Sequence, residues 1–509
     1  MNAVSAQAPD PAAEPVASTA AVSGTPVSGT ALATVTEAVR GWGMAVGGAA
    51  EVLRPTSVEG VRAALALARE RGWKVALRGA GCSYGDASCG TGKLVLDLTR
   101  LDRILEFNPE TGHLRAEAGV TLGQVWHHTL PLGWWPPVVS GTMAPSLGGA
   151  LSMNIHGKNA YKVGTIGEHV TSLVLMTADG EVRTLTLADP LFRAIIGGFG
   201  ALGVVLEVGM QLKRVYSGLI DVHALSAPDL AGMFASFEAW EHKSDYLVGW
   251  IDGFAGGKGL GRGQVHVGHQ LARGVDPDPQ GSMAIARQEL PPRLFGVIPK
   301  SWMWALMKPF AHGPGMRLVN LAKFWSAKLL QHDKRYRQSH AGFHFLLDYV
   351  PNWKWIYRPG GLIQHQCFVP AAQARTTFAA ILALTHERGM PTWLAVMKRH
   401  RPDPFLMTHG LDGYSLALDF PVTEANRLKL WAMCHAIDAL VVQAGGRFYF
   451  AKDATVRPES VAAAFPRENL LTFAALRREL DPDGLFATDL YDRTVAPALA
   501  IVAAKGARE

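Results

Sequence analysis

The chain has 509 residues, of which 48% are hydrophobic and 18% charged, and this balance excludes a globally disordered protein. Its formal net charge of +6 is small for a chain of this length, which argues against nucleic acid as a partner. The four cysteines include no CxxC pair and no HExxH motif occurs, so we expect neither a disulfide framework nor a metal site.

The first 34 residues are rich in Ala, Pro, Ser, Thr, Val and Gly and contain no Lys or Arg. A secretory signal would begin with basic residues and continue with an apolar run, so we expect residues 1–34 to be a disordered leader. No apolar stretch in the chain reaches the roughly 18 residues that a membrane span needs. These features favour a cytoplasmic protein that makes at most a peripheral contact with a membrane.

The signals of an α+β fold begin after the leader. Thr56 and Glu59 form a capping-box pattern, and apolar residues then recur at helical spacing until Gly72, which predicts a helix. Next come a short strand at 73–78 and a Gly-rich stretch at 79–86. A buried strand is predicted to follow at 94–98.

A second Gly-rich stretch, 140–149, follows a hairpin whose turn is 108–112 and a helix that begins near Leu122. Another hairpin, with its turn at 178–180, precedes a strand at 204–212. We therefore expect a first domain at 35–215.

Residues 216–444 carry a second set of strands and helices, including strands at 246–251 and 362–369 and a helix at 370–388. This stretch is predicted to form one substrate or cap domain. Gly-rich sequence returns at 445–453, which indicates a final segment, 445–509, of different character.

Residues 300–337 have an unusual composition. They contain eight Lys or Arg residues and one acid, Asp333, interleaved with Trp and Phe. Such a segment suits peripheral contact with a membrane or a lid over an anionic lipid-linked substrate, because the bases attract phosphate while indole rings prefer the interface. A surface insertion with a solvated basic face remains the alternative.

The two Gly-rich stretches of the first domain are candidate phosphate sites. The loop Gly79–Ser83 lies between two strands, so it is neither a Walker loop nor a strand-to-helix dinucleotide fingerprint. Successive backbone N–H groups in such a turn form an anion-binding nest. The second loop supplies another nest through Gly141, Thr142, Ser146, Gly148 and Gly149, and two nests suit a diphosphate, whereas either loop alone fits a simple tight turn.

Four hydrogen-bonding side chains are concentrated in Asn154–Asn159. Here His156 and Lys158 are candidate proton or phosphate partners. The alternative is a capped loop with Lys158 exposed to solvent.

These segments, in this order, resemble flavoproteins of the vanillyl-alcohol oxidase and p-cresol methylhydroxylase superfamily. Within it, the chain is most similar to the family of the decaprenylphosphoryl-β-D-ribose 2′-oxidases, the flavin subunits of two-enzyme epimerases. The segments that carry the resemblance are 78–86, 148–159, Gln364–Gln366, 445–453 and Phe486–Asp489.

The resemblance implies a bipartite FAD-binding domain, 35–215 plus 445–509, and an α+β substrate domain, 216–444, whose antiparallel sheet covers the flavin. Several relatives attach FAD covalently through a histidine at the position of Cys82, so the resemblance implies non-covalent FAD here, and a thioether through Cys82 is the alternative. The implied cofactor-binding residues are Arg78, Gly79, Ala80, Gly81, Cys82, Ser83, Tyr84, Gly141, Thr142, Ser146, Gly148, Gly149, Met153, His156, Val205, Tyr449 and Lys452.

The family transfers a hydride from a carbinol carbon to flavin N5 while the hydroxyl proton is lost. Lys452 is the first choice to contact both flavin and substrate, and Lys398 is a phosphate or hydroxyl partner unless it is a surface charge. The implied catalytic residues are Tyr84, His156, Lys158, Gln366, Lys398 and Lys452.

The chain departs from its relatives above the flavin. Ser415 and Ala417 stand where the best-known relatives have an Asn-x-Cys pair, and His344 stands in place of a tyrosine. These changes leave the identity of the sugar open and predict insensitivity to inhibitors that attack the missing thiol.

The implied function is FAD-dependent oxidation of a secondary hydroxyl of a sugar, with a polyprenylphosphoryl pentose as the foremost substrate. A short-chain reductase partner would then complete an epimerisation. The alternatives are a free alditol or aldonolactone oxidase that uses oxygen, a flavin-dependent sterol-type reductase, and an idle flavin-binding scaffold.

Overall fold

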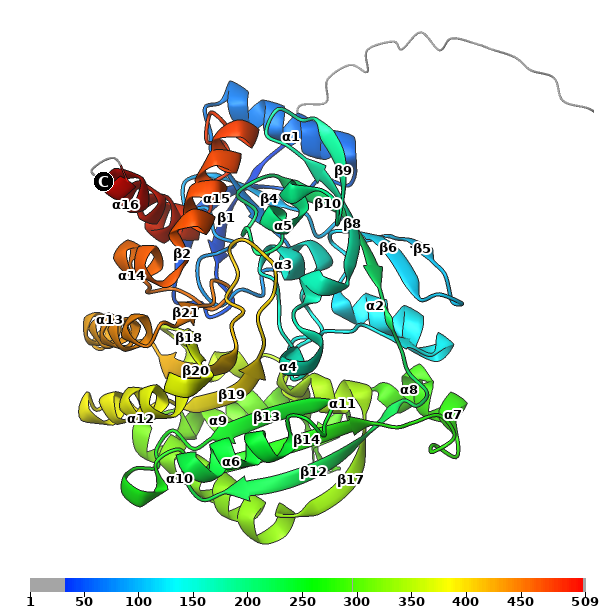
Figure 1. The fold of residues 1–509 in the computed structure, drawn as a ribbon, viewed down its shortest axis with the longest axis vertical. Helices are drawn as coiled ribbons and strands as arrows, with labels where there is room; N and C mark the ends of the chain where they lie inside the picture. Colours follow the sequence, from blue (N-terminus) through cyan, green and yellow to red (C-terminus); the bar gives the residue numbers. More distant parts are fainter. Residues whose placement is uncertain (1–32, 295, 507–509) are drawn as a thin grey trace, which may run out of the picture. The chain divides into compact units, whose positions relative to one another are not determined.

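The computed structural model describes residues 33–294 and 296–506. Nearly all of the expected leader, 1–34, therefore lies outside the described residues. Residues Thr34–Glu509 group into one compact unit, which contains three main sheets (Figure 1). Within the described ranges, no helix combines the length and the apolar character that crossing a bilayer requires.

The first sheet has four strands in the order β1-β2-β4-β3. Helix α1 begins one residue later than the capping-box pattern predicts, because the side chain of Ser57, not Thr56, accepts from Gly60 N. It ends before Gly72, which adopts a positive φ of 65°. The elements are β1 (Val35–Arg40), β2 (Gly47–Leu53), α1 (Val58–Glu70), β3 (Val75–Arg78) and β4 (Leu94–Asp97).

The second sheet is antiparallel, with five strands in the order β5-β6-β10-β8-β9. Both predicted hairpins are present, at β5–β6 and β8–β9. The elements of this region are β5 (Ile104–Phe107), β6 (His113–Glu117), α2 (Leu122–Thr129), β7 (Trp134–Trp135), α3 (Leu147–Ser152), α4 (Ala160–Val163), β8 (Val170–Met176), β9 (Val182–Thr186), α5 (Pro190–Ile195) and β10 (Val204–Gln211).

The third sheet has eight strands in the order β17-β12-β14-β13-β19-β20-β18-β21, and every pairing in it is antiparallel. Helices α6, α12 and α13 pack on one face of it. The elements are β12 (Leu219–Ala227), α6 (Leu230–Trp240), β13 (Tyr246–Ile251), β14 (Gly263–Gln270), β17 (Lys334–Ser339), β18 (Leu362–Pro370), α12 (Ala371–Glu387), β19 (Leu394–His400), β20 (Gly413–Pro421), α13 (Arg427–Gln443) and β21 (Arg447–Phe448).

Smaller elements surround the third sheet. The basic segment forms two α-helices, two 3-10 turns at Lys300–Trp302 and Lys308–Phe310, a π-helical turn at Ala327–Gln331 and the edge strand β17. The remaining elements are β11 (Lys213–Arg214), α7 (Pro279–Met283), α8 (Ile285–Gln288), β15 (Arg293–Leu294), β16 (Ile298–Pro299), α9 (Met303–Met307), α10 (Gly313–Ser326) and α11 (His340–His344).

The C-terminal segment returns to the first sheet, where Figure 1 draws its orange and red helices beside the blue strands. Val75 N donates to Leu485 O, and Ala487 N donates to Val75 O, each over 2.8 Å. Arg493 forms ion pairs with Asp86 and Asp453. The helices are α14 (Pro458–Ala464), α15 (Arg467–Leu480) and α16 (Ala496–Gly506).

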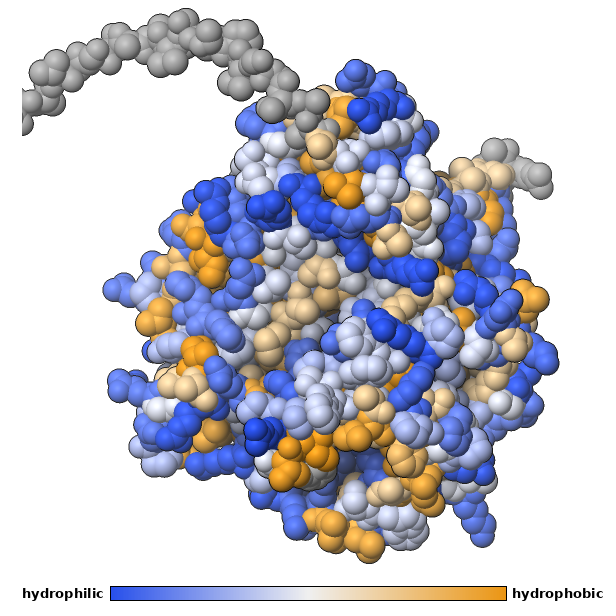
Figure 2. All heavy atoms as spheres, turned by 180° about the vertical axis from the view of Figure 1, so that it is seen from behind, coloured by the Kyte–Doolittle hydropathy of each residue, from blue (hydrophilic) through white to orange (hydrophobic). Residues whose placement is uncertain are grey.

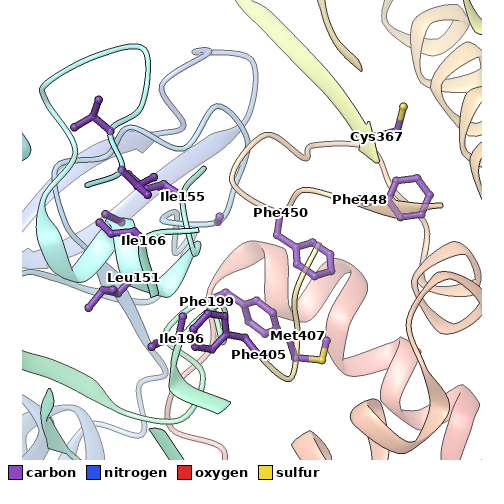
Figure 3. Close-up of a cluster of buried hydrophobic side chains, with 14 of the residues drawn as sticks. Leu151, Ile155, Ile166, Ile196, Phe199, Cys367, Phe405, Met407, Phe448 and Phe450 are labelled. Atoms are coloured by element: carbon purple, nitrogen blue, oxygen red, sulfur yellow. The ribbon is translucent and has the colours of Figure 1, made fainter. Parts of the chain in front are cut away.

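One hydrophobic core runs through these regions. Figure 3 shows Phe199 and Phe405 close together beside Met407, with Phe450 above them. The rings of Phe199 and Phe450 are 5.3 Å apart, so the first region, the third-sheet region and the C-terminal segment share apolar contacts. The mixed content with antiparallel sheets confirms the expected α+β class.

Candidate active site

A cavity of about 460 Å³ lies between the two Gly-rich loops and the open face of the third sheet. Five of its lining residues form one continuous cross-strand row on that face, from β14 to β18. Side chains alternate between the faces of a strand. The intervening side chains therefore lie on the opposite face, where α6, α12 and α13 pack. The row is Gln264, Trp250, Val396, Ala417 and Gln366.

The first Gly-rich loop presents unused backbone donors to the cavity. The N–H groups of Gly81, Cys82 and Ser83 donate to no described residue, and all three residues line the cavity. Three successive free N–H groups form an anion nest, so the loop fits the diphosphate of a dinucleotide cofactor.

The second loop supports the first. Ser146 Oγ accepts from Ala80 N over 3.2 Å. A Cβ atom at Gly79 would lie 2.2 Å from that oxygen, so a side chain at this position would displace the Ser146 hydroxyl that accepts from Ala80 N. Glycine at position 79 therefore keeps this hydrogen bond between the two loops.

The Cys82 side chain is poorly suited to covalent chemistry. Burial raises the pKa of this thiol to about 11, although Lys452 and Arg78 oppose the shift. The thiolate is the nucleophilic form, and it is therefore scarce near neutral pH.

His156 bridges the loops and the sheet. Gln366 Nε2 donates to His156 Nε2 over 3.0 Å, and His156 Nδ1 is buried with no described hydrogen-bond partner. Burial, followed by the charge of Lys398, lowers the pKa of His156 well below its usual value. The ring is therefore neutral and leaves one nitrogen free for a ligand.

Lys452 and Asp419 form the charged centre of the site. The Lys452 ammonium lies 3.4 Å from the centre of the Tyr84 ring. Burial lowers the pKa of Lys452 while Asp419 opposes that shift. Burial also raises the pKa of Asp419, whose Oδ1 accepts from Gln364 and whose Oδ2 has no described partner. Both groups therefore change protonation closer to neutrality than usual.

Two further lysines line the cavity. Lys158 is only 8% exposed and donates to Phe343 O, so the alternative of a solvent-exposed Lys158 is wrong. Burial lowers the pKa of Lys158 to about 7 and that of Lys398 to about 8. Lys398 faces the cavity from β19, which excludes it as an ordinary surface charge.

Every residue that the sequence and the family resemblance nominate as catalytic or cofactor-binding lines this one cavity. The individual roles of these residues stay predictions. The departures from the family pattern, Ser415, Ala417 and His344, line the cavity as well.

Sequence reasoning missed several residues of the site. Asp419 and Gln364 are buried polar residues within the apolar strands β20 and β18. Asp419 shares the alternation of Ser415 and Ala417, and this period of two could have revealed it. Other missed residues of the cavity include Trp250, Gln264, His266 and Lys323.

Comparison with known proteins supports the cofactor. Residues 49–186 match the FAD binding domain family, so the chain has an FAD-binding domain, and the nest and the free His156 nitrogen fit that cofactor.

The relatives that match this chain include proteins named as oxidases and a dehydrogenase. Decaprenylphosphoryl-beta-D-ribose oxidase of Mycolicibacterium smegmatis is 31% identical over 92% of this chain and 99% of its own length. L-gulono-1,4-lactone dehydrogenase of Mycobacterium tuberculosis is 23% identical over 88% of this chain and 96% of its own. L-gulonolactone oxidase of Scyliorhinus torazame matches 31% of this chain and 36% of its own, with 31% identity.

Proposed function

Because the chain is an FAD-dependent oxidoreductase of the decaprenylphosphoryl-β-D-ribose oxidase family, we propose that it oxidises the 2′-hydroxyl of a polyprenylphosphoryl pentose to a ketone. The observation that carries this is the cavity itself, in which a phosphate nest faces a wall bearing Lys398, Lys452 and His156. Such a wall suits an anionic sugar substrate held against a flavin.

FAD is held by a bipartite domain, 35–215 plus 445–509, in this proposal. The N–H groups of Gly81, Cys82 and Ser83 bind its diphosphate, and contacts such as Val75 with Leu485 join the two parts. The cofactor is non-covalent because Cys82 remains a thiol. Acid precipitation then releases yellow colour into the supernatant, whereas colour retained in the pellet means covalent attachment.

When bound, FAD supplies the acceptor for the hydride that leaves the carbinol carbon. The chain's own residues handle the proton. The hydroxyl proton passes to the Lys452 amine, whose lowered pKa favours proton transfer near neutrality, and the buried Asp419 acts on the Lys452 charge. Gln366 and the neutral His156 ring orient the hydroxyl by hydrogen bonding.

The ketone product needs a second enzyme for net epimerisation. A short-chain reductase that delivers a hydride to the opposite face of the carbonyl carbon is the partner that this chemistry requires.

A lipid-linked substrate also gives the basic segment a role as a peripheral membrane contact. Nine of the nineteen exposed large hydrophobic side chains in the described ranges lie at 302–336. Figure 2 shows orange groups among blue ones on the lower part of the molecule, where Figure 1 places α9, α10 and β17. Exposed apolar groups among bases suit an anionic bilayer surface.

The second candidate is a free alditol or aldonolactone oxidase, favoured by the likeness to lactone-oxidising enzymes. Higher identity over nearly the whole chain favours the lipid-linked pentose. No relative described above supports a sterol-type reductase.

A substrate that carries deuterium at the 2′ carbon tests the proposed reaction. We expect anaerobic bleaching of the flavin to slow severalfold relative to the protonated substrate, because the carbon–hydrogen bond breaks in that step. Equal rates at saturating substrate, together with retention of deuterium in the recovered sugar, would show that hydride does not leave from this carbon.

A further inference from the structure

A second cationic group lies in the cavity, away from the Gly-rich loops. Lys323 of α10 projects over Trp250 of β13, with its ammonium 4.1 Å from the ring centre. Gln264 and His266 of the adjacent β14 line the cavity beside it. The strands β13 and β18 are three positions apart in the sheet, which places Trp250 roughly 14 Å from the strand that bears Gln366.

The Lys323 ammonium has no anionic partner in the described part of the chain. Its side chain is solvent-accessible, yet burial alone lowers its pKa to about 8. The side chain lines the cavity, so solvent reaches it through the cavity while protein atoms surround it. The Trp250 ring offsets only part of the lost hydration of such a cation.

No neighbouring charge among the described residues compensates the Lys323 ammonium, because burial is the one cause of its lowered pKa. Burial, and then Lys158 and Lys323, lower the pKa of His266 to about 4, so this ring is neutral and can donate or accept a hydrogen bond. Lys158 in turn is next to Lys398. Basic side chains therefore continue from Lys323 through His266 and Lys158 to Lys398.

The FAD diphosphate does not account for Lys323. The cations that act on Cys82, in the middle of the diphosphate nest, are Lys452, Arg78 and Lys354. Lys323 is not among them. The charge of Lys323 is therefore not directed at the diphosphate nest.

We propose that Lys323, together with Trp250, Gln264 and His266, forms a phosphate subsite at the outer end of the cavity, which binds the phosphate between the sugar and its isoprenoid chain. The inference rests on the proposed function for the identity of the ligand. It assigns the phosphate to α10, so the basic segment contributes one inward-facing lysine to the site. The exposed bases of the same segment face solvent.

Calorimetric measurement of geranyl phosphate binding to the FAD-loaded protein tests this subsite without requiring turnover. We expect Lys323→Met to weaken binding roughly 10- to 100-fold, as loss of a charge-assisted contact implies. Lys323→Arg should retain most of the affinity. Lys328→Met removes an exposed lysine from the same segment and should leave the affinity unchanged.

Two neutral or simpler probes identify the source of the phosphate. Geraniol should bind the parent and Lys323→Met equally, because it lacks the charge. If inorganic phosphate also binds in a Lys323-dependent manner, the subsite recognises phosphate itself, and if only geranyl phosphate does, the isoprenoid chain contributes. Both results support the subsite.

The proposal is overturned if the parent does not bind geranyl phosphate, if Lys323→Met binds it as tightly as the parent, or if Lys328→Met loses as much affinity. Flavin bleaching distinguishes this failure from failure of the proposed function. Lys323-dependent binding without bleaching by a polyprenylphosphoryl pentose would leave the subsite and reject the reaction. If the parent and Lys323→Met both bleach, and do so at the same substrate concentrations, the reaction is supported and the subsite is rejected.

Discussion

Lys452 is the residue on which the proposed chemistry depends most. Its ammonium lies over Tyr84 and next to Asp419, so Lys452→Met removes a proton-transfer group without deleting the bulk of the side chain. We expect substrate-driven bleaching to slow at least about 100-fold while FAD stays bound. Stopped-flow absorbance measures the rate, and the released flavin measures cofactor content.

The matched control is Lys429→Met, which alters an exposed lysine on α13. It should bleach at the parental rate. Parental bleaching in Lys452→Met would instead remove Lys452 from the mechanism.

Asp419 gives the reaction a defined dependence on pH. Burial raises its pKa, and the charged or titratable groups that act on it or feel its charge are Lys452, Tyr84 and Tyr357. The ionised carboxylate stabilises the ammonium that forms when Lys452 takes the substrate proton, so the bleaching rate should rise with pH along a limb that lies above the ordinary carboxyl range. Asp419→Asn should flatten that limb in a pH–rate profile.

An exposed carboxylate serves as the control for this profile. Asp412→Asn, immediately before β20, changes a side chain that is 68% exposed and should keep the limb. A limb that survives in Asp419→Asn would assign it to another group.

At the scale of elements, the segment that contains α9, α10 and the π-helical turn should carry the membrane contact. Trp302, Leu329 and Leu330 are 66%, 72% and 64% exposed. Their joint replacement by serine should lower co-sedimentation with phosphatidylglycerol vesicles roughly tenfold or more, since each loses apolar contact with the interface.

Leu428→Ser is the control for vesicle binding, because Leu428 is 85% exposed on α13. It should bind vesicles like the parent. Undiminished binding of the triple variant would place the contact elsewhere. Complete deletion of 300–337 is a poorer test, because it also removes most of the edge strand β17.

The turn and capping residues of the sequence predicted most elements correctly. Hairpins with turns at 108–112 and 178–180 depend on residues within the turn, and the helix at 370–388 is present as α12. The sequence predicted Thr56 as the N-cap of α1, whereas Ser57 caps the helix in the structure. Both residue types can cap a helix, so the pattern alone does not choose between them. The return near 445 begins with β21, which pairs with β18 of the third sheet.

The Gly loops of the site were predictable for the same local reason, whereas other parts of the site were not. The contact between Gln364 and Asp419 joins residues 55 positions apart. Lys323 came from a segment whose composition indicates a basic surface, and composition does not reveal which lysine turns inward over Trp250. Gln364 and Asp419 meet because β18 and β20 are neighbours in the third sheet, and Lys323 meets Trp250 because α10 packs near β13.

At the scale of the whole molecule, Arg493 ties the C-terminal segment to the site. It pairs with Asp86 beside the first loop and with Asp453 after β21, each over 2.7 Å. Arg493→Met leaves two buried carboxylates without their partner, so the unfolding free energy should fall by about 3–5 kcal/mol. Thermal unfolding with and without added FAD measures this loss.

Because one core spans the described regions, the parent should unfold in a single transition. Bound FAD should raise the midpoint temperature of that transition. Arg457→Met, at an exposed position, should match the parent. An unchanged midpoint in Arg493→Met would show that the ion pairs do not hold the segment in place.

The most direct test of the account is anaerobic titration of the purified, FAD-loaded protein with a polyprenylphosphoryl pentose. The flavin absorbance should bleach with one equivalent of this substrate, and free alditols and aldonolactones should leave it oxidised at the same concentrations. Bleaching by free polyols or lactones alone would contradict a lipid-linked substrate and make the chain a free-sugar oxidase.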